Sequence, residues 1–277
     1  MRNYYVIILL IFWGIHPVFG QNESSQLSVR QLVSTEIVNV PTAGTLGQWE
    51  TAVGLRVYPN GGVLADAGIG ILNRLFVRFY YGGENIIGEG SVNWNHRAGF
   101  DARFRIVDET VLFPGVAIGI NTQGYGGFHS DIDRYTIKSR GIYGVISRNY
   151  AAPFGDVSVH FGSNVSLERK DNDKDLNIFG GATVGIRNVG EWLLEYDAGL
   201  NDNEDLSLGL NKGYFNTGIR LFISADFILS FHFTNLLENT KNHKSIGREI
   251  RIEYRKQFSI KSISISQSKK DPPLVEK

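Results

Sequence analysis

The sequence predicts an all-β protein: a single antiparallel transmembrane β-barrel of roughly twelve strands. The first observation is the alternation of apolar and polar residues, as in residues 155–168, GDVSVHFGSNVSLE, which gives a strand one apolar and one polar face. The second is that no apolar run of about 18 residues follows the N-terminal region, so any membrane crossing must use strands. The third is a composition of 32 Gly, 17 Phe and 12 Tyr against 7 Pro, which suits many short strands.

The first element is a predicted signal peptide, residues 1–20. Arg2 supplies a positive charge, an apolar run covers residues 4–15, and Val18 and Gly20 have the small-residue spacing that signal peptidase accepts. An uncleaved anchor is the alternative, but the run is shorter than the roughly 20 residues of a spanning helix. We therefore expect a cleaved signal peptide, followed by residues 21–47 as an N-terminal periplasmic or lumen segment.

The predicted barrel covers residues 48–258. Its segments of about 9–12 residues match tilted membrane strands better than the shorter strands of soluble sheets. In chain order the predicted strands are 48–58, 63–72, 74–82, 99–107, 115–123, 139–148, 155–167, 175–186, 191–200, 213–223, 225–234 and 248–258. Residues 259–277 are predicted to form one possible extra strand and a polar tail.

The connections between these segments alternate in length. Compact connections are expected at 59–62, 73, 149–154 and 187–190, and long polar ones at 124–138, 169–175 and 236–247. Residues 200–212 are either a long loop or a site of another short strand. Outer-membrane barrels have short turns at the periplasmic end and long loops outside, so this alternation favours a barrel.

Charged residues fall on one face of the predicted strands and apolar residues on the other. In 225–234, for example, Leu229 and Phe231 are expected to face lipid near the middle of the bilayer. Seven arginines and six acids are predicted to form a charge cluster in the lumen, comprising Glu50, Arg56, Arg78, Asp101, Arg103, Arg105, Glu195, Asp197, Arg220, Glu249, Arg251, Glu253 and Arg255. Because the two signs nearly balance, we expect mutual pairing, a closed or low-conductance pore, and leakage when Arg103 and Arg105 are replaced by alanine.

A secreted soluble β-sandwich that binds glycans or envelope partners is the alternative architecture, because its charges would simply face water. Strand length, loop asymmetry and the signal peptide favour the barrel. Large aromatic residues near the predicted strand ends, as in the girdles of outer-membrane barrels, also favour it. These are Tyr58, Tyr81, Tyr150, Trp192, Tyr214 and Phe258.

Residues 171–175, DNDKD, place three aspartates at the alternating spacing of a calcium loop. The EF-hand pattern fails, because Leu176 stands where Gly is expected and Ala182 where Glu is expected. We therefore expect a solvated hairpin tip and no metal site.

Two pairs, His160 with Ser158 and His232 with Ser230, lie on the polar faces of their strands. Residues two apart on one strand are too distant for a direct hydrogen bond, and no G-x-S-x-G motif is present. The sequence thus predicts no catalytic residue and no cofactor, and it predicts hydrogen-bonded lumen histidines. We expect that the protein is not an enzyme.

Several stretches resemble an uncharacterised family of bacterial outer-membrane β-barrels. They are VPTAGTL (40–46), YPNGGVLADAGIGILNRLFV (58–77), YGGENIIG (81–88), NTQGYG (121–126) and RYTIKSRGIYGVISRNY (134–150). The family distantly resembles YjbH-like barrels associated with exopolysaccharide production, and the likeness extends over residues 36–258. It implies a link to surface polysaccharide export, although this chain is much shorter than a YjbH-like protein.

The expected function is a structural, envelope-assembly or narrow-channel role in the bacterial outer membrane. The expected partners are outer-membrane lipids and the barrel-insertion machinery, with polysaccharide as a further candidate. Lys plus Arg equals Asp plus Glu at 28 each, so no basic field attracts nucleic acid. With no cysteine, the chain has neither disulfides nor a lipidated cysteine.

Overall fold

The computed structural model describes residues 34–186, 189–241 and 245–258. The predicted signal peptide and the predicted tail, 259–277, lie outside the described residues. In the described part of the chain, no helix is long and apolar enough to cross a membrane. The strands are β1 (Glu50–Tyr58), β2 (Gly62–Ile71), β3 (Leu75–Glu84), β4 (Asn93–Trp94), β5 (Gly99–Val107), β6 (Gly115–Asn121), β7 (Tyr125–His129), β8 (Arg134–Ile137), β9 (Gly141–Ala152), β10 (Gly155–Val165), β11 (Asn177–Ile186), β12 (Gly190–Asp197), β13 (Tyr214–Phe222), β14 (Phe227–Thr234) and β15 (Gly247–Gln257).

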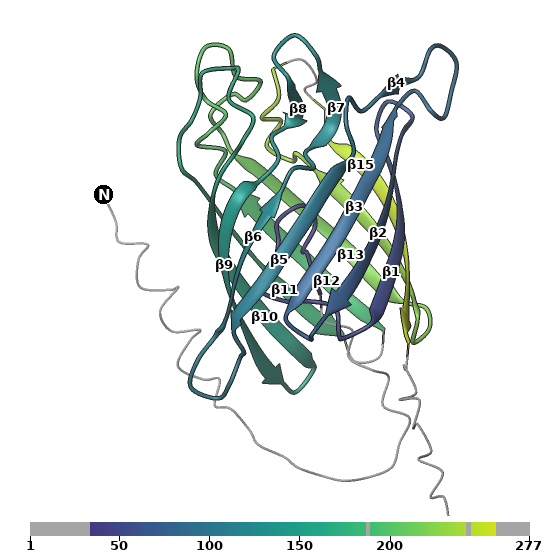
Figure 1. Ribbon diagram of the computed structural model, residues 1–277, viewed down its shortest axis with the longest axis vertical. Coiled ribbons are helices and arrows are strands. Elements are labelled where there is room, and N and C mark those ends of the chain that lie inside the picture. The colour runs from purple at the N-terminus through teal and green to yellow at the C-terminus, as the bar shows by residue number, and fades with distance from the viewer. Residues whose placement is uncertain (1–33, 187–188, 242–244, 259–277) are drawn as a thin grey trace, which may run out of the picture.

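Twelve of these strands form one closed antiparallel barrel (Figure 1). Each barrel strand pairs with the next one along the chain, and β15 closes the ring by pairing with β1, with Glu50 opposite Gln257. Outside the ring, β4 pairs with the end of β3, and β7 pairs with β8 in a separate two-stranded sheet. The predicted barrel is confirmed, and the sandwich alternative is wrong because one sheet closes on itself.

Side chains alternate between the lumen and the exterior along each strand. In β14, Ser230 is 2% exposed and faces the lumen, whereas Phe231 is 41% exposed and faces out. Ile219 and Ile250 lie opposite Phe231 on the neighbouring strands and are also exposed. The exterior is therefore apolar, as the alternation predicts.

The two ends of the barrel differ in the length of their connections (Figure 1). At the long-loop end lie the connections 85–98, 122–140, 166–176 and 198–213, the described parts 235–241 and 245–246 of the last connection, and the short turn 59–61. At the short-turn end lie 72–74, 108–114, 153–154, 189 and 223–226. The predicted alternation in length therefore matches the two ends, with the turn 59–61 as an exception.

Three short strands, β4, β7 and β8, are not predicted by the sequence. They contain only 2, 5 and 4 residues, too few for an alternating pattern to stand out. The predicted turn 149–154 shrinks to 153–154, because β9 continues to Ala152. Residues 200–212 lie in a long loop that contains an isolated bridge between Gly209 and Thr240 and no named strand.

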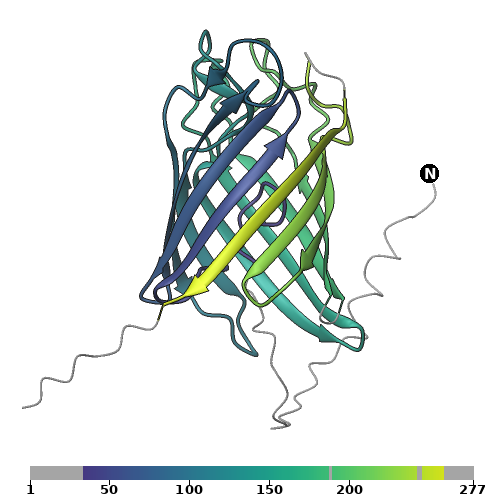
Figure 2. The same ribbon diagram turned by 90° about the vertical axis from the view of Figure 1, so that its right-hand side faces the viewer.

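Residues 34–47, here called the plug hairpin, lie inside the barrel (Figure 2). The segment turns back on itself, with Ile37 N–H donating to Val40 O at 3.0 Å and Thr42 N–H donating to Thr35 O at 3.2 Å. The sequence leaves open whether this region is periplasmic or within the lumen. The structure places the described part within the lumen.

Candidate functional site: a plugged lumen

The tip of the plug hairpin binds one carboxylate of the barrel wall. Backbone N–H groups of Val38, Asn39 and Val40 all donate to Glu195 Oε2, at 2.8, 2.7 and 2.9 Å. The other oxygen of Glu195 accepts from Asn216 Nδ2 at 2.7 Å. Three converging N–H groups form a concave anion site, so the wall carboxylate satisfies a turn that has no strand partner of its own.

Three wall arginines bind the carbonyl oxygens of the same hairpin. Arg56 donates to Val38 O at 2.7 Å and to the side chain of Asn39 at 2.8 Å. Arg103 donates to the carbonyl oxygens of residues 35 and 44 at 2.6 and 2.8 Å, and Arg220 to those of residues 36 and 37 at 2.8 and 2.9 Å. The wall thus supplies both the acceptors and the donors that buried backbone groups require.

Apolar contacts complete the seat of the hairpin. Ile37 and Val40 are fully buried in a cluster that includes Phe179 and Leu193 of the wall. Gly181 on β11 faces this cluster, and a Cβ atom at that position would lie 2.3 Å from Leu194 O on the neighbouring strand and 2.7 Å from Ile37 Cδ1. Absence of a side chain at Gly181 therefore makes room for the hairpin.

The structure places the side chains of the predicted charge cluster as follows. All of them except Arg105 are buried, and Arg105 lies at the short-turn end, where it pairs with Asp108. Ion pairs within the cluster include Arg56–Glu249, Arg78–Glu253, Arg103–Asp101, Arg251–Glu253 and Arg255–Glu253. Several arginines bind the hairpin as well as an acid, so the cluster contacts more than its own members.

Four participants are missing from the sequence-based cluster. Glu36 of the hairpin pairs with Arg78 and Arg251, at 3.5 and 3.3 Å. The other three are Asp66, which pairs with the same two arginines, Arg140, which pairs with Asp197, and Asn216. Asp66 lies on the polar face of a predicted strand and is detectable from alternation alone. Glu36 gives no such signal, because the hairpin has no repeating pattern.

At the long-loop end, a second charge group joins three loops. This loop clasp comprises Arg134, Lys138, Asp171, Asp173 and Asp202. Arg134 Nη1 lies 2.6 Å from Asp171 and 2.7 Å from Asp202, and Lys138 Nζ lies 2.7 Å from Asp171. The prediction of a solvated tip is wrong for Asp171 and Asp173, which are buried because cations from another loop neutralise this region.

Glu168, beside the clasp, should make loop stability depend on pH. Its carboxylate accepts from Tyr135 N–H and Ser139 N–H at 3.2 and 3.4 Å, yet burial raises its pKa from 4.5 to about 7. The unfolded loop ionises first, so loop stability is fully present below pH 4.5 and falls as the pH rises through 7, by roughly 3 kcal/mol. Hydrogen exchange of residues 166–176 at pH 5 and pH 8 measures this. The variant Glu168→Gln should lose the dependence, and an unchanged dependence would assign it to another group.

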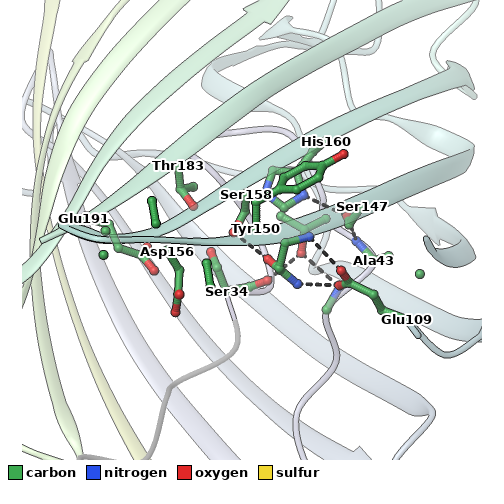
Figure 3. Close-up of a pocket in the computed structure, with 18 of the residues that line it drawn as sticks. Ser34, Ala43, Glu109, Ser147, Tyr150, Asp156, Ser158, His160, Thr183 and Glu191 are labelled. Carbon is green, nitrogen blue, oxygen red and sulfur yellow. Dashed lines mark hydrogen bonds between the residues drawn. The ribbon is translucent and has the colours of Figure 1, made fainter. Parts of the chain in front are cut away.

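A cavity of about 820 Å³ lies below the hairpin, toward the short-turn end. Ser34, Thr42 and Ala43 of the hairpin line it together with residues of β9 to β12 (Figure 3). Ser147 Oγ accepts from Ala43 N–H at 2.8 Å and lies 2.7 Å from His160 Nδ1 (Figure 3). The histidine and serine thus attach the hairpin to the wall.

The lumen histidines differ from the sequence-based expectation in their partners. His160 pairs across the strands with Ser147, its direct neighbour in the β9–β10 register, and Ser158 bonds to Asn149 instead. Among the described residues, His160 Nε2 and both ring nitrogens of His232 make no hydrogen bond, so the predicted hydrogen bonding is wrong for His232. No group of three metal-ligating side chains occurs in the described ranges.

No family model and no curated protein matches the sequence. Among solved structures, a KdgM porin is 10% identical with a TM-score of 0.45, over 75% of this chain and 99% of its own. A NanC porin is 10% identical with a TM-score of 0.44, over 76% of this chain and 100% of its own. A KdgM porin in complex with disordered oligogalacturonate is 10% identical with a TM-score of 0.43, over 76% of this chain and 99% of its own. The likeness is a distant one of overall fold.

A lipid bilayer is the environment that suits this barrel, because its exterior is apolar and its charged side chains lie in the lumen. In water, the exposed Phe, Ile and Trp side chains around the wall would form a large apolar surface, whereas in lipid they are solvated. Closure leaves no unpaired strand edge for lipid to meet. The protein is a β-barrel of the bacterial outer membrane. The general rule for such barrels assigns the long loops to the outside and the short turns to the periplasm.

Proposed function

We propose that the protein is a narrow outer-membrane channel that the plug hairpin holds closed. The observation that supports this most is the binding of three consecutive N–H groups by Glu195, with carbonyl oxygens bound by Arg103 and Arg220. Backbone that belongs permanently to a wall is paired within the sheet. The hairpin instead uses side-chain partners, which water replaces when the hairpin leaves.

The width of the barrel supports the same proposal. Eight-stranded barrels are filled by their own side chains and those of sixteen or more strands are open, so twelve strands leave room for one segment. Below the hairpin, the lumen contains a cavity of about 820 Å³. The side chains of the wall therefore do not fill the lumen by themselves. Withdrawal of the hairpin would extend this space toward the outer end.

A structural or envelope-assembly role is the second candidate, and the loop clasp favours it. Its buried ion pairs join loops 122–140, 166–176 and 198–213 at the outer end of the barrel. These joined loops obstruct the lumen at a second level, in addition to the plug hairpin. We propose no catalytic role, because the pair of His160 and Ser147 holds Ala43 of the hairpin.

Single-channel recording in planar bilayers tests the channel. The unmutated protein should show little conductance, and Glu195→Ala should produce a steady current, because three buried N–H groups lose their common acceptor. Arg103→Ala should act in the same direction, since it frees two hairpin carbonyl groups. Heat-modifiable gel migration would establish that each variant is a folded barrel.

Arg105→Ala is the matched control, because Arg105 pairs with Asp108 and donates to Asn73 O in the turn 72–74, outside the hairpin. Arg105→Ala should conduct as little as the unmutated protein. The leakage expected when both Arg103 and Arg105 are replaced by alanine should therefore come from the loss of Arg103. A large current from the unmutated protein would refute the plug. Silence of both Glu195→Ala and a deletion of residues 36–43, in folded barrels, would refute the channel and favour the structural role.

For the solute, we propose a polysaccharide, as the resemblance to exopolysaccharide-associated barrels implies. Hydroxyl and amide groups of Asn149, Ser158 and Thr183 line the cavity and suit neutral sugar hydroxyls. In the same recordings, a neutral oligosaccharide should reduce the current of Glu195→Ala. No reduction would remove polysaccharide as the solute while leaving the channel intact. Lipids and the barrel-insertion machinery remain the other proposed partners.

A further inference from the structure

One connection at the outer end extends beyond the rim of the barrel. Residues 85–95, here called the arm, follow β3 and return through β4. β3 pairs with β5 only as far as Tyr80, and beyond that point it pairs with β4, with Gly83 opposite Trp94. The arm therefore continues the wall beyond the last barrel pairing of β3, on the side away from the lumen (Figure 1).

The arm carries an aromatic pair on its outer face. Residues opposite each other in an antiparallel pair point to the same side, so Trp94 shares the outward face of Gly83 and Tyr81. The rings of Tyr81 and Trp94 stack, with centroids 5.7 Å apart and planes at 8°. Tyr81 and Trp94 remain 49% and 52% exposed, so the described protein leaves about half of the surface of each residue uncovered.

The arm has a defined place against the barrel rim. Asn85 N–H donates to Asn60 O at 2.9 Å, and Ile86 and Ile87 both donate to Gly61 O at 3.0 and 2.9 Å. Gly61 has φ +61, and a Cβ atom there would lie 1.9 Å from Ile87 O, so only glycine permits this approach. Ile87, thus positioned, is itself exposed.

The surface of the arm continues the lipid-facing surface of the barrel. Phe79 and Tyr81 follow one another on the outward face of β3, about 7 Å apart along the strand, and Phe79 is exposed. Ile87, Val92 and Trp94 extend this apolar surface onto the arm, where Glu89 is the sole charged residue among 85–95.

We propose that the arm lies on the outer leaflet of the membrane, with Tyr81 and Trp94 among the lipid headgroups. Amphipathic aromatic rings favour this interface, and the surface joins the lipid-facing wall without a break. Lipid is therefore the occupant, rather than a second copy of the chain or open water. The arm holds the barrel at one depth and orientation, a role separate from conduction.

Fluorescence quenching of Trp94 tests this placement. In Trp49→Phe with Trp192→Phe, Trp94 is the single tryptophan of the predicted mature chain. The folded protein is placed in liposomes whose lipids carry bromine either near the headgroup or near the chain ends. Trp94 should be quenched strongly by headgroup-proximal bromine, weakly by deep bromine, and weakly by iodide in the water.

Two comparisons make the result decisive. A second single-tryptophan protein, Trp49→Phe with Trp94→Phe, retains Trp192 on the lipid-facing wall and reports quenching at a known lipid contact. Adding Ile87→Glu to the first protein should lift the arm, reducing bromine quenching and raising iodide quenching. Strong iodide quenching without bromine quenching would overturn the proposal in favour of a solvated arm. Protection from both quenchers would overturn it in favour of contact with a second copy.

Discussion

Replacing Arg134 by methionine should destabilise the outer loops by about 3–5 kcal/mol, the usual cost of removing one partner from a buried ion pair. Arg134 is fully buried and binds Asp171 and Asp202 at 2.6 and 2.7 Å. It also donates to the carbonyl oxygens of Tyr135 and Thr136, both at 2.9 Å. Its loss removes one donor from buried acceptors in three loops at once, while Lys138 stays bound to Asp171 and Tyr214 to Asp202.

Hydrogen exchange of the liposome-inserted protein measures this cost. At the lower limit, residues 166–176 and 198–213 should open on the order of 100-fold more often, while barrel strands exchange as before. Lys170→Met is the matched control, since Lys170 lies 3.2 Å from Asp133 but is 66% exposed. It should cost at most about 1 kcal/mol. Equal effects of the two variants would contradict the role of the clasp.

Replacing Phe231 by arginine should cost about 2–4 kcal/mol, because a guanidinium at mid-bilayer loses its hydration. Phe231 lies near the middle of β14 and faces lipid between Ile219 and Ile250. Leu229 is the preceding residue on the same face of β14 and lies opposite Ile252, at the middle of β15, so its mid-bilayer depth stays a prediction. Leu229→Arg should cost a similar amount. Urea unfolding in liposomes gives both values.

A lumen-facing substitution serves as the control for this pair. Ser230 is a poor choice, because it lies opposite Arg220 and Arg251, and a third guanidinium there would be repelled and crowded. Ser158 lines the cavity beside Asp156 and Glu191, so Ser158→Arg enters open, acidic space and should be nearly neutral. Similar costs for Phe231→Arg and Ser158→Arg would contradict the assignment of the two faces.

The alternation of residue types predicted the barrel and the facing of its side chains because both depend on a repeat of two. Arg56, Glu195 and Glu253 could be assigned to the lumen without any knowledge of their partners. Strand ends were less predictable. β12 ends at Asp197 rather than at residue 200, where Gly199 adopts φ +61 and the chain turns.

The plug hairpin could not be predicted, because its structure depends on partners far away in the chain. Residues 34–47 show no alternating pattern, and Val40 meets Glu195 across 155 positions. The prediction that Asp171 is solvated was wrong for the same reason, because its partners Arg134 and Lys138 belong to another loop. A single sequence reports local periodicity, and these contacts are not local.

The seam between β1 and β15 has a consequence for biogenesis. The first and last strands of the barrel pair with each other, so the ring stays open until β15 has joined β1. Arg251, which binds Glu36 of the hairpin, lies on that last strand. Closure of the barrel and completion of the contact between the wall and the hairpin therefore depend on the same strand.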